Sequence, residues 1–174
     1  MPPMIAFAAV VAVFLSVYFW VVMRNDRTVA ASATTDDASS QSSRPVVILD
    51  QRDWCGFKVA GCRYHQGELV RIFGPYRRVA LQLRCDAAFE REPGNVEDSD
   101  AVAVKIEGRL VGRFPRHDAA AFSAWMRDNQ VPIDAMFPCR AYVYGGRRTN
   151  QHDETPYYVS INYQWPPRIL EIRS

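Results

Sequence analysis

The residues of this chain that are best suited to chemistry are its arginines. Of the 21 lysine and arginine residues only Lys58 and Lys105 are lysines, and the formal net charge is +2. A guanidinium group presents a planar fork of donors that fits phosphate oxygens, and it stacks on aromatic rings better than an ammonium group does. The composition therefore favours contacts with phosphate, although a GC-rich genome that encodes arginine in place of lysine explains the same bias.

The sequence offers little support for catalysis or for a bound metal. It has no glycine loop of the ATPase type and no Ser/His/Asp spacing, and the carboxylates within residues 90–100 are typical of a solvated loop. Cys55 and Cys62 are too far apart for the short cysteine pairs of zinc sites, and Cys85 and Cys139 are remote from both. We therefore expect no cofactor and no catalytic residues, with zinc as a less favoured alternative and free thiols favoured over disulfides.

The elements that must position these side chains show mostly a period of two. Residues 79–84 and 101–114 alternate apolar and polar side chains, and Gly108 with Arg109 predicts a tight turn, so residues 101–114 form a β-hairpin. Residues 54–64 predict a first strand and residues 67–73 a short helix or turn. A helix is predicted from Pro115 to Asn129, because apolar residues recur there at helical spacing.

Two further strands are predicted at residues 137–144 and 157–165, joined by a polar loop at residues 145–154. The resulting order of elements is typical of an α+β, mostly β fold: a small, partly open antiparallel barrel of the OB or SH3 type with one packed helix.

The N-terminus predicts one membrane span ahead of this domain. Residues 4–23 carry no charged side chain, and at about 1.5 Å per residue they cover a bilayer core of about 30 Å. Arg24 and Arg27 follow the span directly, which predicts that the C-terminal domain faces the cytoplasm. Residues 24–45, rich in Ser, Thr and Ala, read as a flexible linker to a domain at residues 46–174, while a cleaved signal peptide is the alternative.

Four short motifs follow one another in the domain in a fixed order. They are VAGCRYHQG at residues 59–67, REPGN at 91–95 followed by Asp98, DAVAV at 100–104, and VGRFPR at 111–116. Together these motifs resemble the HIRAN domain family over about residues 54–163. The resemblance implies an OB-like barrel, and it implies binding of single-stranded DNA at its 3′ end, as in a family member that is fused to a helicase-like ATPase.

The resemblance also implies which side chains bind DNA. Arg63, Tyr64 and His65 fall where the family has a basic residue and aromatic platforms, and Asp98 falls at the acidic position that accepts the terminal sugar hydroxyl. Arg113 and Arg116 fall at the phosphate-binding positions after the hairpin.

Glu97 departs from the family pattern, because an aromatic residue usually precedes the acidic one. Tyr144, with Tyr142 on the same face of its strand, is the aromatic residue that we expect to compensate.

The sequence therefore predicts a membrane-anchored module that binds single-stranded DNA, most specifically its 3′ ends. A carboxylate such as Asp98 accepts a hydrogen bond from a free hydroxyl but repels a continuing phosphate. The partners expected are single-stranded DNA and the lipid bilayer. Two alternatives remain: a protein-interaction scaffold at the membrane, and a targeting subunit for a DNA-processing ATPase or nuclease that acts in trans.

Overall fold

The computed structural model describes residues 44–150 and 153–173. The predicted membrane span at residues 4–23 lies outside these residues, as does nearly all of the predicted linker. In the part of the chain that the structure describes, no helix combines the length and apolar character needed to cross a bilayer. The membrane span and the orientation inferred from it therefore stay predictions.

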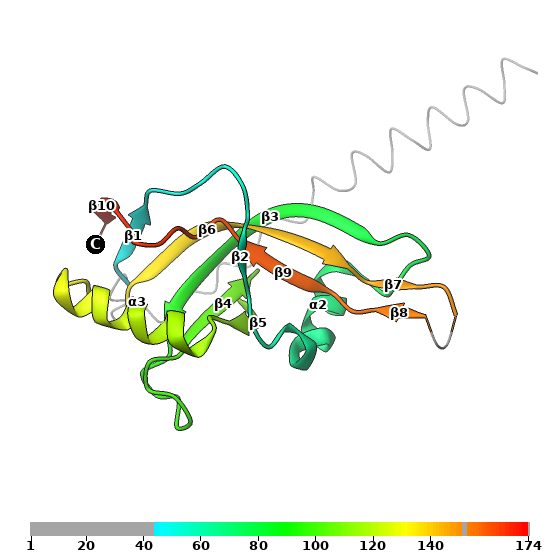
Figure 1. The fold of residues 1–174 in the computed structure, drawn as a ribbon, viewed down its shortest axis with the longest axis horizontal. Helices are drawn as coiled ribbons and strands as arrows, with labels where there is room; N and C mark the ends of the chain where they lie inside the picture. The colour runs from blue at the N-terminus through cyan, green and yellow to red at the C-terminus, as the bar shows by residue number, and fades with distance from the viewer. Residues whose placement is uncertain (1–43, 151–152, 174) are drawn as a thin grey trace, which may run out of the picture. The chain divides into compact units, whose positions relative to one another are not determined.

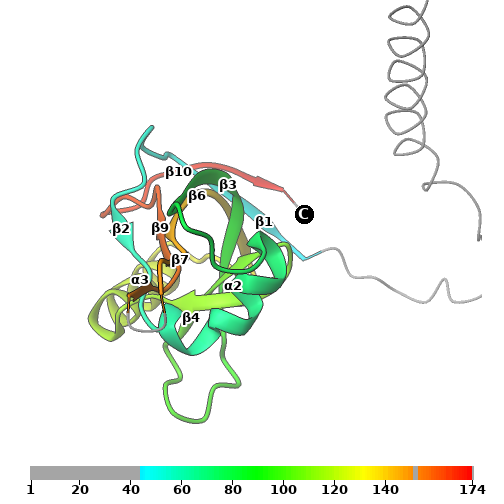
Figure 2. The same ribbon diagram turned by 90° about the vertical axis from the view of Figure 1, so that its right-hand side faces the viewer.

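The described chain is a mostly antiparallel sheet that curls into half a barrel (Figure 1), with its strands arranged around a common centre (Figure 2). The strands are β1 (Val46–Leu49), β2 (Phe57–Lys58), β3 (Leu81–Arg91), β4 (Val102–Ile106), β5 (Arg109–Arg113), β6 (Met136–Gly145), β7 (Arg147–Arg148), β8 (Glu154–Thr155), β9 (Tyr158–Ile161) and β10 (Ile169–Arg173). The helices are a 3₁₀ turn η1 (Cys62–His65), the short α2 (Gln66–Phe73) and the longer α3 (Arg116–Asp128). The predicted mostly β fold is confirmed.

The main sheet has the order β10-β1-β6-β3-β4-β5, and β9 pairs with both β6 and β2. An isolated bridge joins the two edges of the curled sheet, because Ala60, just after β2, pairs with Arg113 at the end of β5. Two backbone hydrogen bonds of 2.7 and 2.9 Å form this bridge. We call it the seam of the barrel.

Gly112 explains how the backbones approach so closely at the seam. A Cβ atom at this position would lie 2.5 Å from the carbonyl oxygen of Ala60 and 2.5 Å from a methyl group of Val59. Such distances are far inside van der Waals contact, so only glycine allows the two edges to meet.

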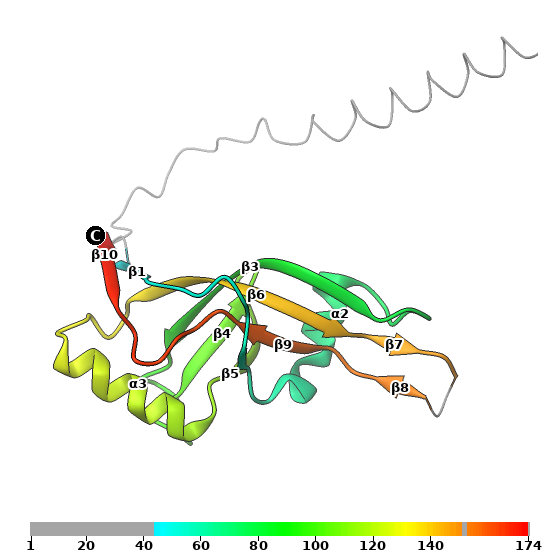
Figure 3. The same ribbon diagram turned by 45° about the horizontal axis from the view of Figure 1, so that its top comes forward.

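An aromatic core fills the barrel. Phe89 on β3 stacks on Phe137 of β6 with ring centroids 5.1 Å apart, and Phe122 of α3 packs edge-on against both rings. Phe122 and Met126 are almost fully buried, which confirms the apolar stripe predicted for this helix. Figure 3 shows α3 at one end of the sheet and the β7–β8 hairpin at the other.

Several boundaries differ from the prediction. Only Phe57–Lys58 is a strand within residues 54–64, because the chain turns at Gly61, whose φ of +76° is left-handed, into η1. The hairpin at residues 101–114 is confirmed, but its turn is formed by Glu107 and Gly108, both with positive φ. α2 is a second helix, where the prediction allowed a helix or a turn.

The strands β1 and β10 were not predicted. They pair with each other over residues 46–49 and 169–173, and β1 also touches β6 at Met136. The last two residues of the predicted linker already belong to the domain: Arg44 forms an ion pair of 3.0 Å with Glu90, and Pro45 accepts a hydrogen bond from the Met136 amide.

Candidate nucleic-acid interface

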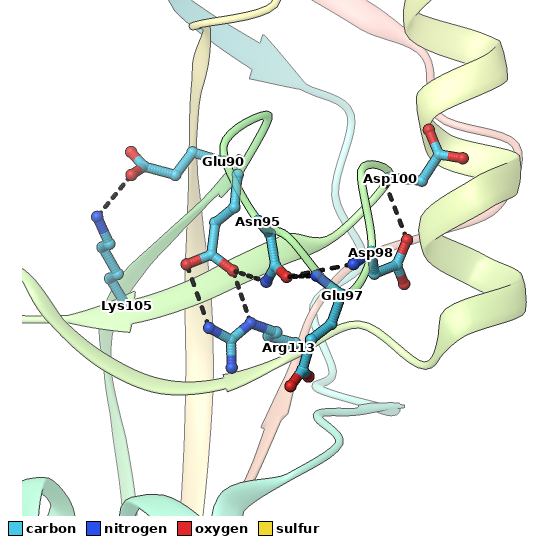
Figure 4. Close-up of polar contacts among 8 residues, drawn as sticks. Glu90, Asn95, Glu97, Asp98, Asp100, Lys105 and Arg113 are labelled. Atoms are coloured by element: carbon cyan, nitrogen blue, oxygen red, sulfur yellow. Dashed lines mark hydrogen bonds and ion pairs between the residues drawn. The ribbon is translucent and has the colours of Figure 1, made fainter.

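The loop between β3 and β4 is held by its own short side chains. The Asn95 side-chain oxygen accepts hydrogen bonds from the backbone amides of Glu97 at 3.0 Å and Asp98 at 3.2 Å (Figure 4). One oxygen of the Asp98 carboxylate accepts a hydrogen bond from the Asp100 amide at 3.0 Å. Asn and Asp side chains commonly fix turns in this way, so the loop is ordered before any ligand arrives.

Two arginines anchor this loop to the barrel. Arg91 is nearly buried and donates to the Asp100 carboxylate at 3.2 Å. Glu92, at the start of the loop, holds Arg113 of β5 with two hydrogen bonds, of 2.6 Å from Nε and 3.3 Å from Nη2. A two-point contact of this kind fixes the plane of the guanidinium group.

A pocket of about 440 Å³ opens beside the loop. It is lined by Asn95, Glu97, Asp98, Ala101, Arg113, Phe114 and Arg116. The structure thus brings together three of the predicted binding residues, namely Asp98, Arg113 and Arg116, although they come from a loop, a strand and the start of α3.

The two arginines of the pocket are held differently. Arg113 is fixed by Glu92, whereas the Arg116 side chain is 79 % exposed and, among the described residues, has one ion pair, of 3.4 Å from Nε to Asp98. Arg116 also donates to the Glu97 carbonyl oxygen at 3.3 Å. Arg113 is therefore a fixed donor and Arg116 a mobile one, since exposed ion pairs are weak.

The formal charges of the pocket lining balance. Glu97 and Asp98 contribute two carboxylates, and Arg113 and Arg116 contribute two guanidinium groups. The anion at Glu97 that the sequence analysis identified as a departure thus lies in the pocket itself, where it opposes the approach of a phosphate.

The predicted Arg63, Tyr64 and His65 lie on η1, which packs against β5. The Tyr64 side chain is 72 % exposed, and the Arg63 guanidinium lies 4.5 Å from the centre of its ring. Burial lowers the pKa of His65, and the nearby Arg113 charge lowers it further against the opposing effect of Glu92 and Glu68. His65 is therefore a neighbour of the Arg113–Glu92 pair, and Tyr64 offers a solvent-facing ring.

Comparison with known families gives a clear result. The HIRAN domain model matches residues 54–152, which is more than half of the chain. This chain belongs to the HIRAN domain family. HIRAN domains are generally DNA-binding modules for 3′ ends. No significant match was found among curated proteins or among solved structures.

Tyr144 does not line the pocket of this HIRAN domain. It lies on the outward face of β6, in a stack with Tyr142 and Tyr158. Of the seven binding residues proposed from sequence, three therefore share the pocket, the three on η1 lie on the element beside β5, and Tyr144 lies on a different face.

Roles for Glu92, Asn95 and Tyr158 were not predicted from the sequence. Glu92 and Asn95 are part of the REPGN motif. Glu92 orients Arg113, and Asn95 holds the β3–β4 loop through hydrogen bonds to its backbone. Tyr158 could have been found from strand pairing, because it lies opposite Tyr144 in the predicted pair of strands.

The cysteines take no part in this interface. All four are unpaired, and burial raises the pKa of Cys139 strongly. Among the described residues there is no group of three or more His, Cys, Asp or Glu side chains that could hold a metal ion.

Proposed function

We propose that this HIRAN domain binds single-stranded DNA and recognises a free 3′ end in the pocket beside the β3–β4 loop. The observation that carries the proposal is that a carboxylate, Asp98, lines one open pocket together with the guanidinium groups of Arg113 and Arg116. The generally DNA-binding character of the family supports it.

The pocket provides a chemical basis for end recognition. A terminal 3′ hydroxyl donates a hydrogen bond to the Asp98 carboxylate, which retains lone pairs beyond those that face Asp100 and Arg116. A strand that continues through this point has a phosphate instead, and two anions in contact repel each other. The carboxylate therefore selects an end by excluding a continuing chain.

The two arginines bind the last phosphates of the strand. Arg113 presents its remaining N–H donors in an orientation fixed by Glu92, so little conformational entropy is lost on binding. Arg116 gives up its weak ion pair with Asp98 and binds a phosphate instead. Tyr64 supplies an exposed ring on which the terminal base stacks.

The test compares matched oligonucleotides with a 3′ hydroxyl and a 3′ phosphate, measured by fluorescence anisotropy at low salt. We expect the hydroxyl form to bind more tightly. Asp98→Asn should abolish the difference, because the amide oxygen still accepts the Asp100 hydrogen bond but no longer repels phosphate. Asp128→Asn is the matched control, an exposed carboxylate at the far end of α3.

Two outcomes contradict the proposal: equal binding of the two oligonucleotides by the unaltered protein, and no binding of either at low salt.

We further propose that residues 4–23 anchor this module to a membrane with the domain in the cytoplasm. The uncharged length of the segment and the arginines that follow it support this. If the full chain is extracted from membranes by alkaline carbonate, which leaves integral proteins in place, the anchor is excluded.

A further inference from the structure

A continuous row of side chains runs around the outside of the barrel from the pocket. Arg113 pairs with Ala60 at the seam. The antiparallel register of β2 on β9, extended by two residues, places Ala60 opposite Tyr158, and the hydrogen bond from the Val59 amide to the Val159 carbonyl supports this extension. Strands lie about 4.8 Å apart, so the Tyr158 backbone is about 10 Å from that of Arg113.

The row continues beyond Tyr158 into a ladder of tyrosines. Tyr158 lies opposite Tyr144 on β6, and Tyr142 follows two residues away on the same face. The ring centroids are 5.4 Å apart for Tyr158 and Tyr144 and 5.8 Å for Tyr144 and Tyr142, with interplanar angles of 25° and 24°. The three rings are thus stacked on one another.

Only the end of such a stack offers a free ring face. Tyr158 is the end nearest the pocket, and it is 40 % exposed. Its neighbour on the pocket side is Ala60, an exposed residue whose methyl group is too small to cover a tyrosine ring. Ala60 therefore leaves a gap in the row of large side chains between Tyr158 and Arg113, where a flat group can stack on Tyr158.

Cations flank the tyrosine stack. Lys58 lies opposite Ser160 on β9, and Arg84 of β3 lies opposite Tyr142. Both are exposed, and among the described residues neither takes part in an ion pair. The carboxylate of Asp86 on the neighbouring β3 position is already paired with Arg140 at 2.9 Å. The face therefore combines stacked rings with two free positive charges.

From this arrangement we infer that the tyrosine face, which comprises Lys58, Arg84, Tyr142, Tyr144 and Tyr158, binds the nucleotides that precede the 3′-terminal one. A base stacks on Tyr158 above Ala60, and phosphates contact Lys58 and Arg84. Rings interleaved with cations fit a single strand of nucleic acid, because every nucleotide supplies both a flat base and a phosphate. The inference rests on the proposed function for the direction of the strand.

The test uses the full-length protein and a series of labelled thymidine nucleotides, from the mononucleotide upward, each with a free 3′ hydroxyl. Tyr158→Ala should weaken binding of the longer strands by about five- to 150-fold, the range of one lost stacking contact, and leave the mononucleotide, which has no preceding base, unaffected. Tyr158→Phe is the matched control, because it keeps the ring and should bind normally. Ala60→Leu should fill the gap and reproduce the length-dependent loss.

A second variant keeps the inference testable if Tyr158→Ala fails to fold. Lys58→Gln is an exposed change, and for long strands it should lower the slope of log affinity against log salt by about 0.7, the value for one phosphate contact in single strands.

The outcomes separate the inference from the function on which it rests. If the preference for a 3′ hydroxyl is present but the Tyr158 and Lys58 variants bind every length like the unaltered protein, the tyrosine face is not part of the site. If the preference is absent and the Tyr158 loss is still observed, end recognition is wrong and the stacking surface stands. Equal affinity for polyglutamate and for oligothymidine overturns the assignment of a nucleic-acid strand.

Discussion

Arg116→Ala is expected to weaken DNA binding while leaving the fold nearly as stable. The Nε atom of Arg116 lies 3.4 Å from the Asp98 carboxylate, and the arginine side chain is 79 % exposed. Two unit charges at this separation attract by about 1 kcal/mol in water, and measured values for exposed pairs are about 0.2–1 kcal/mol. The free energy of unfolding should therefore fall by less than about 1 kcal/mol, and the melting temperature by no more than about 4 °C.

The effect on binding follows from the loss of one phosphate contact. In single strands each phosphate contact contributes about 0.7 to the slope of log affinity against log salt. The ratio of the affinity of the unaltered protein to that of the variant should therefore be about 2.6-fold larger at 50 mM salt than at 200 mM salt. Fluorescence anisotropy across this range, with urea unfolding of the same preparations, measures both quantities. The variant should be impaired most at low salt.

Arg113→Ala is the comparison variant, and it should lower stability more than Arg116→Ala does. It leaves the partly buried Glu92 carboxylate without its two donors, which costs about 1–3 kcal/mol of stability in addition to any loss of binding. If Arg116→Ala leaves the salt slope unchanged, or destabilises the domain as much as Arg113→Ala, the division between a mobile and a fixed donor is refuted.

Three further changes test other parts of the pocket and the seam. Glu97→Gln removes a carboxylate from the pocket lining and should raise affinity for single-stranded DNA at low salt; an unchanged affinity in the same anisotropy assay would show that this anion does not meet the phosphates. Gly112→Ala places a Cβ atom 2.5 Å from the Ala60 carbonyl oxygen and should lower the urea-unfolding free energy by about 1–3 kcal/mol or more, whereas full stability would mean that the seam can open by the width of a methyl group. Burial and Arg113 lower the pKa of His65 below its ordinary 6.5, so on acidification the unfolded chain binds a proton at His65 before the folded chain does. The contribution of neutral His65 to the free energy of unfolding is therefore complete above about pH 6.5 and declines as the pH falls below it. His65→Gln should flatten this part of the pH–stability curve, and an identical curve would exclude the effect.

The elements with a strong local pattern were predictable from sequence. The hairpin β4–β5 and the helix α3 follow from alternation and from helical spacing, and both have the boundaries expected within a few residues. β1 and β10 were missed because their pairing joins the two ends of the domain, and no local signal in a four-residue run such as VVIL indicates a partner more than 100 residues away. The short β2 was overestimated because Gly61 turns the chain into η1.

The site was predictable in its residue types and only partly in its geometry. The motif resemblance identified Asp98, Arg113 and Arg116, and the structure gathers these three in one pocket. It could not indicate that Glu92 holds Arg113, because that pair depends on how β3 and β5 are positioned across β4. Tyr144 was expected to compensate for Glu97 because it shares a strand face with Tyr142, and the structure places both on the outward face of β6, away from the pocket lining.

The seam also has a consequence for how the barrel opens. β3 and β6 are paired along ten residue positions, but Ala60 and Arg113 join the edges through only two backbone hydrogen bonds. Local opening in proteins starts where few bonds must break, so the amide protons of Ala60 and Arg113 should exchange with solvent well before those in the centre of the sheet. The weakly bonded seam therefore runs through Arg113, which also lines the pocket, so a ligand in the pocket contacts one of the two residues that close the barrel.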